Sequence, residues 1–182
     1  MHRMLRVLVI AFASVVLTAV QARAQSGPSA DFAFGYVYMH DNDLDTGFPA
    51  GWMVSAAGHV TSWFSLVGEV GGSYKTVSGP PDVSLSLHTF SFGPRFGVTQ
   101  RAPIAPFIQV LIGVAHGSVG VSGANVGVVF TGNDFLFQPG AGIDINGGGN
   151  VGLRLEGDVR GLQSNGSSHG EWRLVAALVL KR

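Results

Sequence analysis

Charged residues occupy every second position of one short segment, Gly152 to Gly161, which reads GLRLEGDVRG. Leucine, valine or glycine fills the positions between them, although only 12% of the whole chain is charged. Alternation with a period of two is typical of a β-strand that has one charged face and one apolar face. The chain must therefore fold so that the two faces of this strand meet two different environments.

Seven further segments show the same alternation, and clusters of Gly, Pro, Asn, Asp and Ser separate them. The 27 glycines disfavour long helices. The expected strands are residues 31–39, 52–60, 64–74, 88–98, 107–117, 135–145, 152–161 and 172–180. Short turns are expected at 61–63, 99–105 and 146–150, and longer loops at 41–51, 75–87, 118–134 and 162–171. The pattern predicts an all-β fold, an eight-stranded antiparallel up-and-down β-barrel with its short turns at one end.

The first residues have the features of a signal peptide. Arg3 and Arg6 precede an uncharged apolar run over residues 7–20, and a small-x-small site follows at residues 22–24. The run is shorter than the ~20 residues that a membrane-spanning helix needs. We therefore expect residues 1–24 to be a signal peptide cleaved after Ala24, and residues 25–182 to form one barrel domain.

Composition narrows the class of protein further. Without Arg3, Arg6 and Arg23 the chain carries eight basic and eleven acidic residues, a net charge of −3, which disfavours nucleic acid as a partner. The absence of cysteine excludes disulfides, thiol chemistry and Cys metal sites. Yet 46% of the residues are hydrophobic and the mean hydropathy is +0.33, with no second long apolar run. This combination favours a transmembrane β-barrel of the outer membrane.

The charged faces are also rich in Gly, Ala and Ser, whereas the opposite faces are bulky and almost uncharged. An Arg or Lys that faces the bilayer midplane costs ~2–4 kcal/mol, so the charged faces are expected to line the lumen. An eight-stranded barrel is just wide enough for side chains to fill, so we expect a filled polar lumen and no wide pore. The expected lumen polar network comprises Asp31, His59, Glu69, Arg95, Gln109, Gln138, Asp144, Arg154, Glu156, Asp158, Arg160 and Arg173. The expected aromatic residues at the membrane interfaces are Trp52, Trp63, Tyr74 and Trp172.

The turn between the sixth and seventh expected strands sets their register. With the turn centred at Gly148, Gly142 should lie opposite Arg154, Gly140 opposite Glu156, and Gln138 opposite Asp158. The glycines would leave volume for the charged side chains. Opposite charges should meet these side chains, with Arg95, Glu69 and Arg173 as the best candidates, and Glu156→Ala should destabilise the barrel far more than Asp43→Ala.

Several segments in order resemble the OmpA-like, opacity-type family of outer membrane β-barrel domains: FGYVY, FSFGPRF, APFIQVLIGVAHG, FQPGAGIDI and WRLVAALVL. The resemblance runs from residue 31 to residue 180. It implies an eight-stranded outer membrane barrel, usually without enzymatic activity. We further expect a monomer without cofactor or metal. The expected partners are outer membrane lipid and lipopolysaccharide, the barrel assembly machinery, periplasmic chaperones and an extracellular ligand. The chain ends in LVLKR, whereas members of this family commonly end in an aromatic residue that helps assembly.

The expected function is therefore a structural or surface-binding, adhesin-like role. One alternative is a lipid A-modifying, deacylase-like enzyme that uses His116 and Ser118. The alternation places both side chains on the outer face of the barrel, near its outer rim. Deacylases of this kind carry the motif H-x-S-N, and Val119 stands where the motif has Asn, which weakens this alternative. The second alternative is a soluble lipocalin-like calyx, which would place its apolar side chains inside.

Overall fold

The computed structural model describes residues 30–42, 45–77, 79, 82–98, 102–123, 126–164 and 167–182, without the side chains of 122–130 and 164–168. The expected signal peptide, residues 1–24, and its cleavage after Ala24 lie outside the described residues. Within the described ranges, no helix has the length and apolar character needed to cross a membrane.

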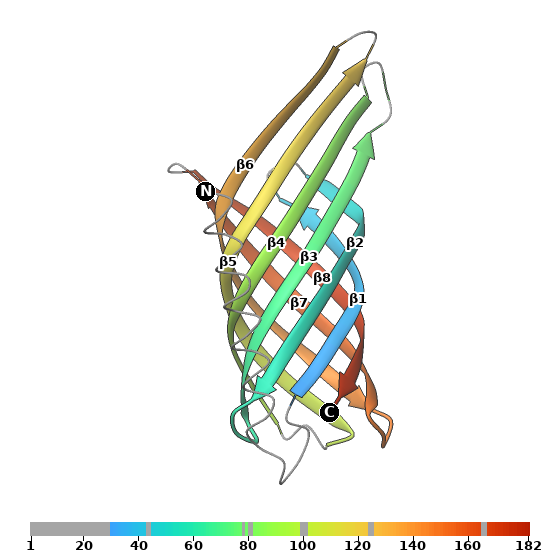
Figure 1. Ribbon diagram of the computed structural model, residues 1–182, viewed down its shortest axis with the longest axis vertical. Helices are drawn as coiled ribbons and strands as arrows, with labels where there is room; N and C mark the ends of the chain where they lie inside the picture. Colours follow the sequence, from blue (N-terminus) through green and yellow to red (C-terminus); the bar gives the residue numbers. More distant parts are fainter. Residues whose placement is uncertain are drawn as a thin grey trace.

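Eight antiparallel strands form a closed barrel in which each strand pairs with the next and the first pairs with the last (Figure 1). Both the strand count and the up-and-down order of the sequence prediction are confirmed. The strands are β1 (Ala30–Asp41), β2 (Thr46–His59), β3 (Phe64–Val77), β4 (Asp82–Gly97), β5 (Ile104–Gly123), β6 (Val126–Asn146), β7 (Val151–Ser164) and β8 (Ser167–Lys181).

The four connections expected as long loops are mostly strand, so that part of the prediction is wrong. β5 and β6 reach 20 and 21 residues, and their ladder continues to Gly123 and Val126. Residues such as Gly120 and Ser84 resemble turn residues in the sequence, yet each lies opposite the other in a regular ladder. Cross-strand hydrogen bonding has overridden their local preference.

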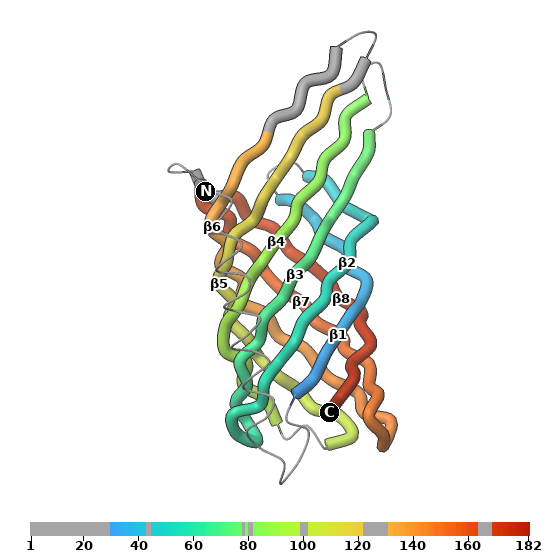
Figure 2. The backbone as a smooth tube through the Cα atoms, viewed as in Figure 1, coloured from blue at the N-terminus to red at the C-terminus, as the bar shows by residue number. Residues whose placement is uncertain are grey.

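Strands β3 to β6 rise above the other four at one end of the barrel (Figures 1 and 2). The ladder between β2 and β3 ends at Ala50 and Tyr74, and the ladder between β6 and β7 ends at Phe135 and Gln163. The ladders within β3 to β6 continue past these points. We call this part, together with the rim residues just below it, the projecting sheet: residues 73–77, 82–88, 116–123 and 126–134.

Below the projecting sheet, the barrel has an apolar outer face, and its inner face carries the charged and polar side chains, as expected from the alternation. Small apolar clusters, which include Met53 and Leu111, lie among them. Phe34 and Leu155 are about half exposed on the outside, at 48% and 50%. Arg95 and Arg154 are at most 1% exposed inside. A lipocalin-like calyx would have the opposite arrangement, so the structure contradicts that alternative.

In the projecting sheet the polarity of the two faces inverts. Along β4 the outer face changes from Phe92 and Phe90 to His88 and the serines at positions 86 and 84. The inner face of the same strand changes from Ser91 and Thr89 to Leu87, Leu85 and Val83. β5 shows the same change. Its outer face goes from Val114 to His116, and its inner face above Ala115 carries Val119 and Val121.

His88, His116 and Asn133 lie side by side where this inversion occurs. Below them the outer face suits lipid, and above them it suits water. The row therefore marks the outer boundary of the apolar band.

Candidate functional site

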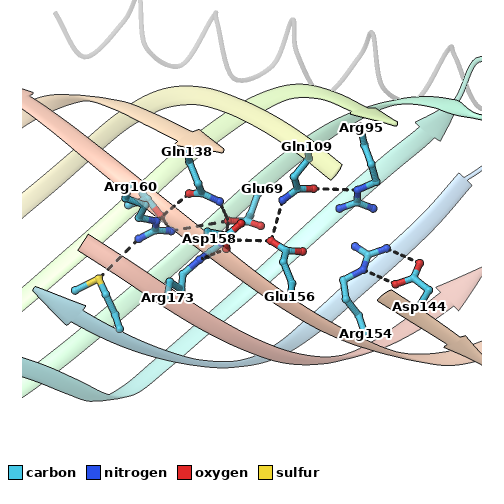
Figure 3. Close-up of polar contacts among 12 residues, drawn as sticks. Glu69, Arg95, Gln109, Gln138, Asp144, Arg154, Glu156, Asp158, Arg160 and Arg173 are labelled. Atoms are coloured by element: carbon cyan, nitrogen blue, oxygen red, sulfur yellow. Dashed lines mark hydrogen bonds and ion pairs between the residues drawn. The ribbon is translucent and has the colours of Figure 1, made fainter. Parts of the chain in front are cut away.

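The structure places all twelve residues of the expected polar network inside the barrel, eleven of them buried and His59 nearly so. Figure 3 labels ten of them, all except Asp31 and His59, and these ten lie in two clusters along the lumen. Arg173 of β8 is the centre of the upper cluster. Its Nη2 atom lies 2.7 Å from Asp158, 2.8 Å from Glu69 and 3.5 Å from Glu156. One guanidinium therefore serves three carboxylates that come from β3 and β7.

Arg160 completes the upper cluster from β7. Its Nε atom donates to Gln138 at 2.8 Å, and its Nη2 atom lies 3.9 Å from Glu69. Gln138 in turn donates to Glu69 at 3.3 Å. Such hydrogen bonds are what allow buried charges to persist without water.

Arg154 is the centre of the lower cluster. It holds Asp144 in a two-pronged contact, with Nε and Nη2 donating at 2.7 and 2.9 Å. Its Nη2 atom also lies 3.5 Å from Asp31, which contacts His59 at 3.1 Å and Arg95 at 3.8 Å. The first strand is thus tied to β2, β4 and β7 through a single carboxylate.

Gln109 joins the two clusters. Its side-chain oxygen accepts from Arg95 Nε at 2.9 Å, and its amide nitrogen donates to Glu156 at 2.8 Å. The ring of Phe107 lies against both lower arginines, with its centroid 4.5 Å from the guanidinium carbon of Arg95 and 4.9 Å from that of Arg154. The lumen is consequently a continuous packed network.

The sequence prediction omitted Glu171, Lys181 and Phe107 from the lumen. All three are at most 8% exposed, and Lys181 Nζ donates to Asn146 at 2.5 Å. Glu171 and Lys181 lie an even number of positions from Arg173 on β8, and Phe107 lies two positions from Gln109 on β5, so each faces the same side as a predicted lumen residue. Extending the alternation to the strand ends would therefore have found them.

The predicted register between β6 and β7 is wrong by two residues. Asp144 lies opposite Arg154, Gly142 opposite Glu156, and Gly140 opposite Asp158. The turn spans residues 147–150, with Gly148 at a φ of 81°. The paired residues are symmetric about position 149, one position later than predicted, and this moves every partner by two.

The two glycines still leave space for lumen side chains. A Cβ at Gly140 would collide with Asp158 Oδ1, as expected for a glycine that makes room for a charged group. A Cβ at Gly142 would instead meet the ring of Phe107 at 2.5 Å. Of the predicted partners, Glu69 and Arg173 contact charges of β7, whereas Arg95 contacts Asp31 and Gln109.

An apolar cluster closes the lumen above the charges. Its buried members are Met39, Phe48, Leu87, Ala115, Leu136 and Leu162, which we call the plug. The plug adjoins the upper cluster, because Arg160 Nη1 lies 3.9 Å from the sulfur of Met39. Charged groups below and packed aliphatic groups above leave no wide path through the barrel.

The predicted interface aromatics lie at both ends of the apolar band. Trp52 Nε1 donates to the Tyr74 hydroxyl at 3.2 Å, and that hydroxyl lies 3.0 Å from His88 Nε2 at the outer boundary. Trp172 stacks on His40, with ring centroids 5.3 Å apart, near the same end. Trp63 packs on Phe96 at the end with the short turns.

The residues of the enzymatic alternative are not joined to each other. His116 Nδ1 is bonded to Asn133 at 2.8 Å, and the Ser118 hydroxyl is bonded to Ser86 at 2.7 Å. A nucleophile needs its base within hydrogen-bond reach, and each of these groups is instead bonded to a different neighbour. Nowhere in the described ranges do three metal-ligating side chains gather.

No known protein family matches the sequence, and no curated protein matches it either. Solved structures do match the fold. Ail, the attachment invasion locus protein of Yersinia pestis, is 14% identical with a TM-score of 0.64, over 85% of this chain and 100% of that one. Neisserial surface protein A is 11% identical with a TM-score of 0.64, over 84% and 96%.

A third structure, the N-terminal β-barrel domain of Pseudomonas aeruginosa OprF, is 14% identical with a TM-score of 0.58, over 86% of this chain and 100% of that one. At these identities the likeness shows the fold alone. The fold is that of a small eight-stranded outer membrane barrel.

Proposed function

We propose that this protein is a monomeric integral outer membrane barrel that displays the projecting sheet to the outside and serves a structural or surface-binding role. The observation that carries the proposal is the inversion of polarity at His88, His116 and Asn133. A sheet whose outer face changes from phenylalanine to serine is built to leave the lipid and enter water.

The packed lumen supports the same role. Two buried charge clusters and an apolar plug fill the barrel, so its interior serves stability and its exposed end is left for recognition. We propose that the barrel contacts lipid and lipopolysaccharide through its outer apolar band. We further propose that it reaches the outer membrane with a signal peptide cleaved after Ala24, through periplasmic chaperones and the barrel assembly machinery.

A non-enzymatic role is the better proposal, because His116 and Ser118 are each bonded to other neighbours. The segments quoted from the sequence support membership of the OmpA-like, opacity-type family as part of the same proposal.

The orientation can be tested with single cysteines, because the chain has none of its own. We expect a membrane-impermeant maleimide to label Ser84→Cys, in the projecting sheet, on intact cells. Thr61→Cys, in a short turn at the other end, is the matched control and should react only after the outer membrane is opened. Equal labelling of the two variants on intact cells would contradict the proposal.

Two further measurements test the membrane barrel itself. Carbonate or urea should leave the protein in the membrane fraction, and its release would contradict an integral barrel. Purified protein in planar bilayers should give no large stable channel, and conductance on the scale of a general porin would contradict the packed lumen.

A further inference from the structure

On β4 and β5 the described inner face of the projecting sheet is apolar although it lies above the charged lumen. Leu87, Leu85 and Val83 follow one another on β4, and Val119 and Val121 lie opposite the last two on β5. On β3, Val77 lies opposite Val83. We call these six residues the inner patch.

Exposure rises along the inner patch with distance from the barrel. Leu87 is 9% exposed and belongs to the plug, and Leu85 packs against the plug. Val83, Val119 and Val121 are partly exposed, and Val77 reaches 48%. The patch is therefore an apolar surface continuous with a buried apolar core, and covering it would gain roughly 25 cal/mol for each Å² removed from water.

The patch offers a partner almost nothing to hydrogen-bond. On β4 and β5 the ladders to both neighbouring strands occupy the backbone N–H and C=O groups, whereas residues 75–77 of β3 form an edge that is paired with β4 but not with β2. A peptide laid across the patch would bury amides without partners, at a cost of roughly 1–3 kcal/mol for each one. A saturated hydrocarbon chain has no such groups, so it fits the surface better.

One cation borders the patch. Lys75 lies opposite Leu85 on the inner face. The other charged residue on the described inner face of the projecting sheet is Asp134 of β6, which lies opposite Ala115. Its Nζ atom donates to Thr46 at 3.1 Å, which leaves ammonium protons for an anion. A ligand with one aliphatic chain and an anionic head group would match both the patch and the lysine.

We propose that the inner patch binds the aliphatic chain of a single-chain anionic amphiphile, of the fatty acid type, with its carboxylate at Lys75. This inference rests on the proposed function, because it requires the projecting sheet to stand outside the membrane. It names the chemical class that the surface-binding role would recognise.

The test uses the full mature chain in phosphatidylcholine nanodiscs and a dodecanoic acid that carries a photoreactive diazirine near its chain end. Irradiation followed by peptide mass spectrometry should place the label on residues 77–87 and 117–121. Val83→Asp should reduce this labelling about tenfold or more, because it sets a charge against the chain. Ser84→Asp is the matched control, since it adds the same charge one residue away on the outer face, and it should leave the labelling unchanged.

The head group is tested separately with Lys75→Met and two probes, the acid and the corresponding alcohol. Labelling by the acid should fall roughly twofold to fivefold, the range for an exposed ion pair, while labelling by the alcohol stays the same. Label confined to the lipid-facing band, or equal labelling of Val83→Asp and Ser84→Asp, would overturn the proposal. So would displacement of the probe by an apolar peptide and not by unlabelled dodecanoate. These failures would leave the cysteine accessibility of Ser84→Cys intact, so they are distinguishable from failure of the proposed function.

Discussion

Arg173 should be the most sensitive position of the lumen, and Arg173→Met tests this. Methionine keeps much of the side-chain length but removes the guanidinium that lies within 2.8 Å of both Asp158 and Glu69. Removing one partner of a buried ion pair typically costs ~3–5 kcal/mol, because the other charge is left uncompensated. Here three carboxylates lose the same partner, so we expect at least the upper part of that range.

Glu156→Gln is the informative comparison at the same cluster. Glu156 lies 3.5 Å from Arg173, farther than either competing carboxylate, and its Oε2 atom has no hydrogen-bond partner within the described part of the chain. Glutamine would keep an oxygen to accept from Gln109 and would remove one of the three negative charges. We therefore expect a change within about 1 kcal/mol, the size of a net hydrogen bond.

The assay is urea unfolding in lipid vesicles, followed by tryptophan fluorescence. With a urea dependence of ~1–3 kcal/mol per molar, Arg173→Met should lower the midpoint by about 1 M or more. Asp45→Asn is the exposed control, because the Asp45 side chain is 97% exposed and 3.5 Å from His40, and it should cost no more than ~1 kcal/mol. Equal midpoints for Arg173→Met and Glu156→Gln would refute the idea that one guanidinium holds the cluster together.

Two other predictions follow from the packing. Gly140→Ala should destabilise the barrel by ~1–3 kcal/mol, because its Cβ would collide with Asp158, whereas Gly132→Ala, where the Cβ meets open space, should be nearly neutral in the same urea assay. Trp63 and Trp172 lie at opposite ends of the apolar band, so lipids brominated at a shallow depth should quench the fluorescence of both most strongly. Strong quenching of either tryptophan by bromine at the bilayer centre would contradict their placement.

The faces of the strands could be predicted from the sequence, because alternation decides them residue by residue. Arg154 and Leu155 had to face opposite sides whatever their cross-strand neighbours were. Ion-pair partners such as Asp31 and Arg154 could not be predicted, since they lie 123 positions apart and depend on closure of the barrel.

Strand ends and register were less predictable. Gly120 and Ser84 read as loop residues because their local preference gives no sign of the partner strand that lies opposite each of them. The register between β6 and β7 is a second case. Its centre lies one position later than predicted, so Asp144, and not Gly142, lies opposite Arg154.

The prediction that Glu156→Ala is far more damaging than Asp43→Ala stays a prediction, because Asp43 lies outside the described residues. The contacts give Arg173 a larger role in stability than Glu156.

The position of Arg173 on the last strand has a consequence for biogenesis. Its carboxylate partners belong to β3 and β7, and Asp31 on the first strand finds its arginines on β4 and β7. A nascent sheet that lacks β8 would hold Glu69, Glu156 and Asp158 without the guanidinium that contacts all three of them. Arg160 of β7, 3.9 Å from Glu69, would remain as a cation beside them. Arg173 lies opposite Asp158 where β8 pairs with β7, and it reaches Glu69 across the lumen. We therefore expect the last strand to stabilise the carboxylates that the first seven strands bring together, so that a chain truncated before β8 is much less stable than the complete ring.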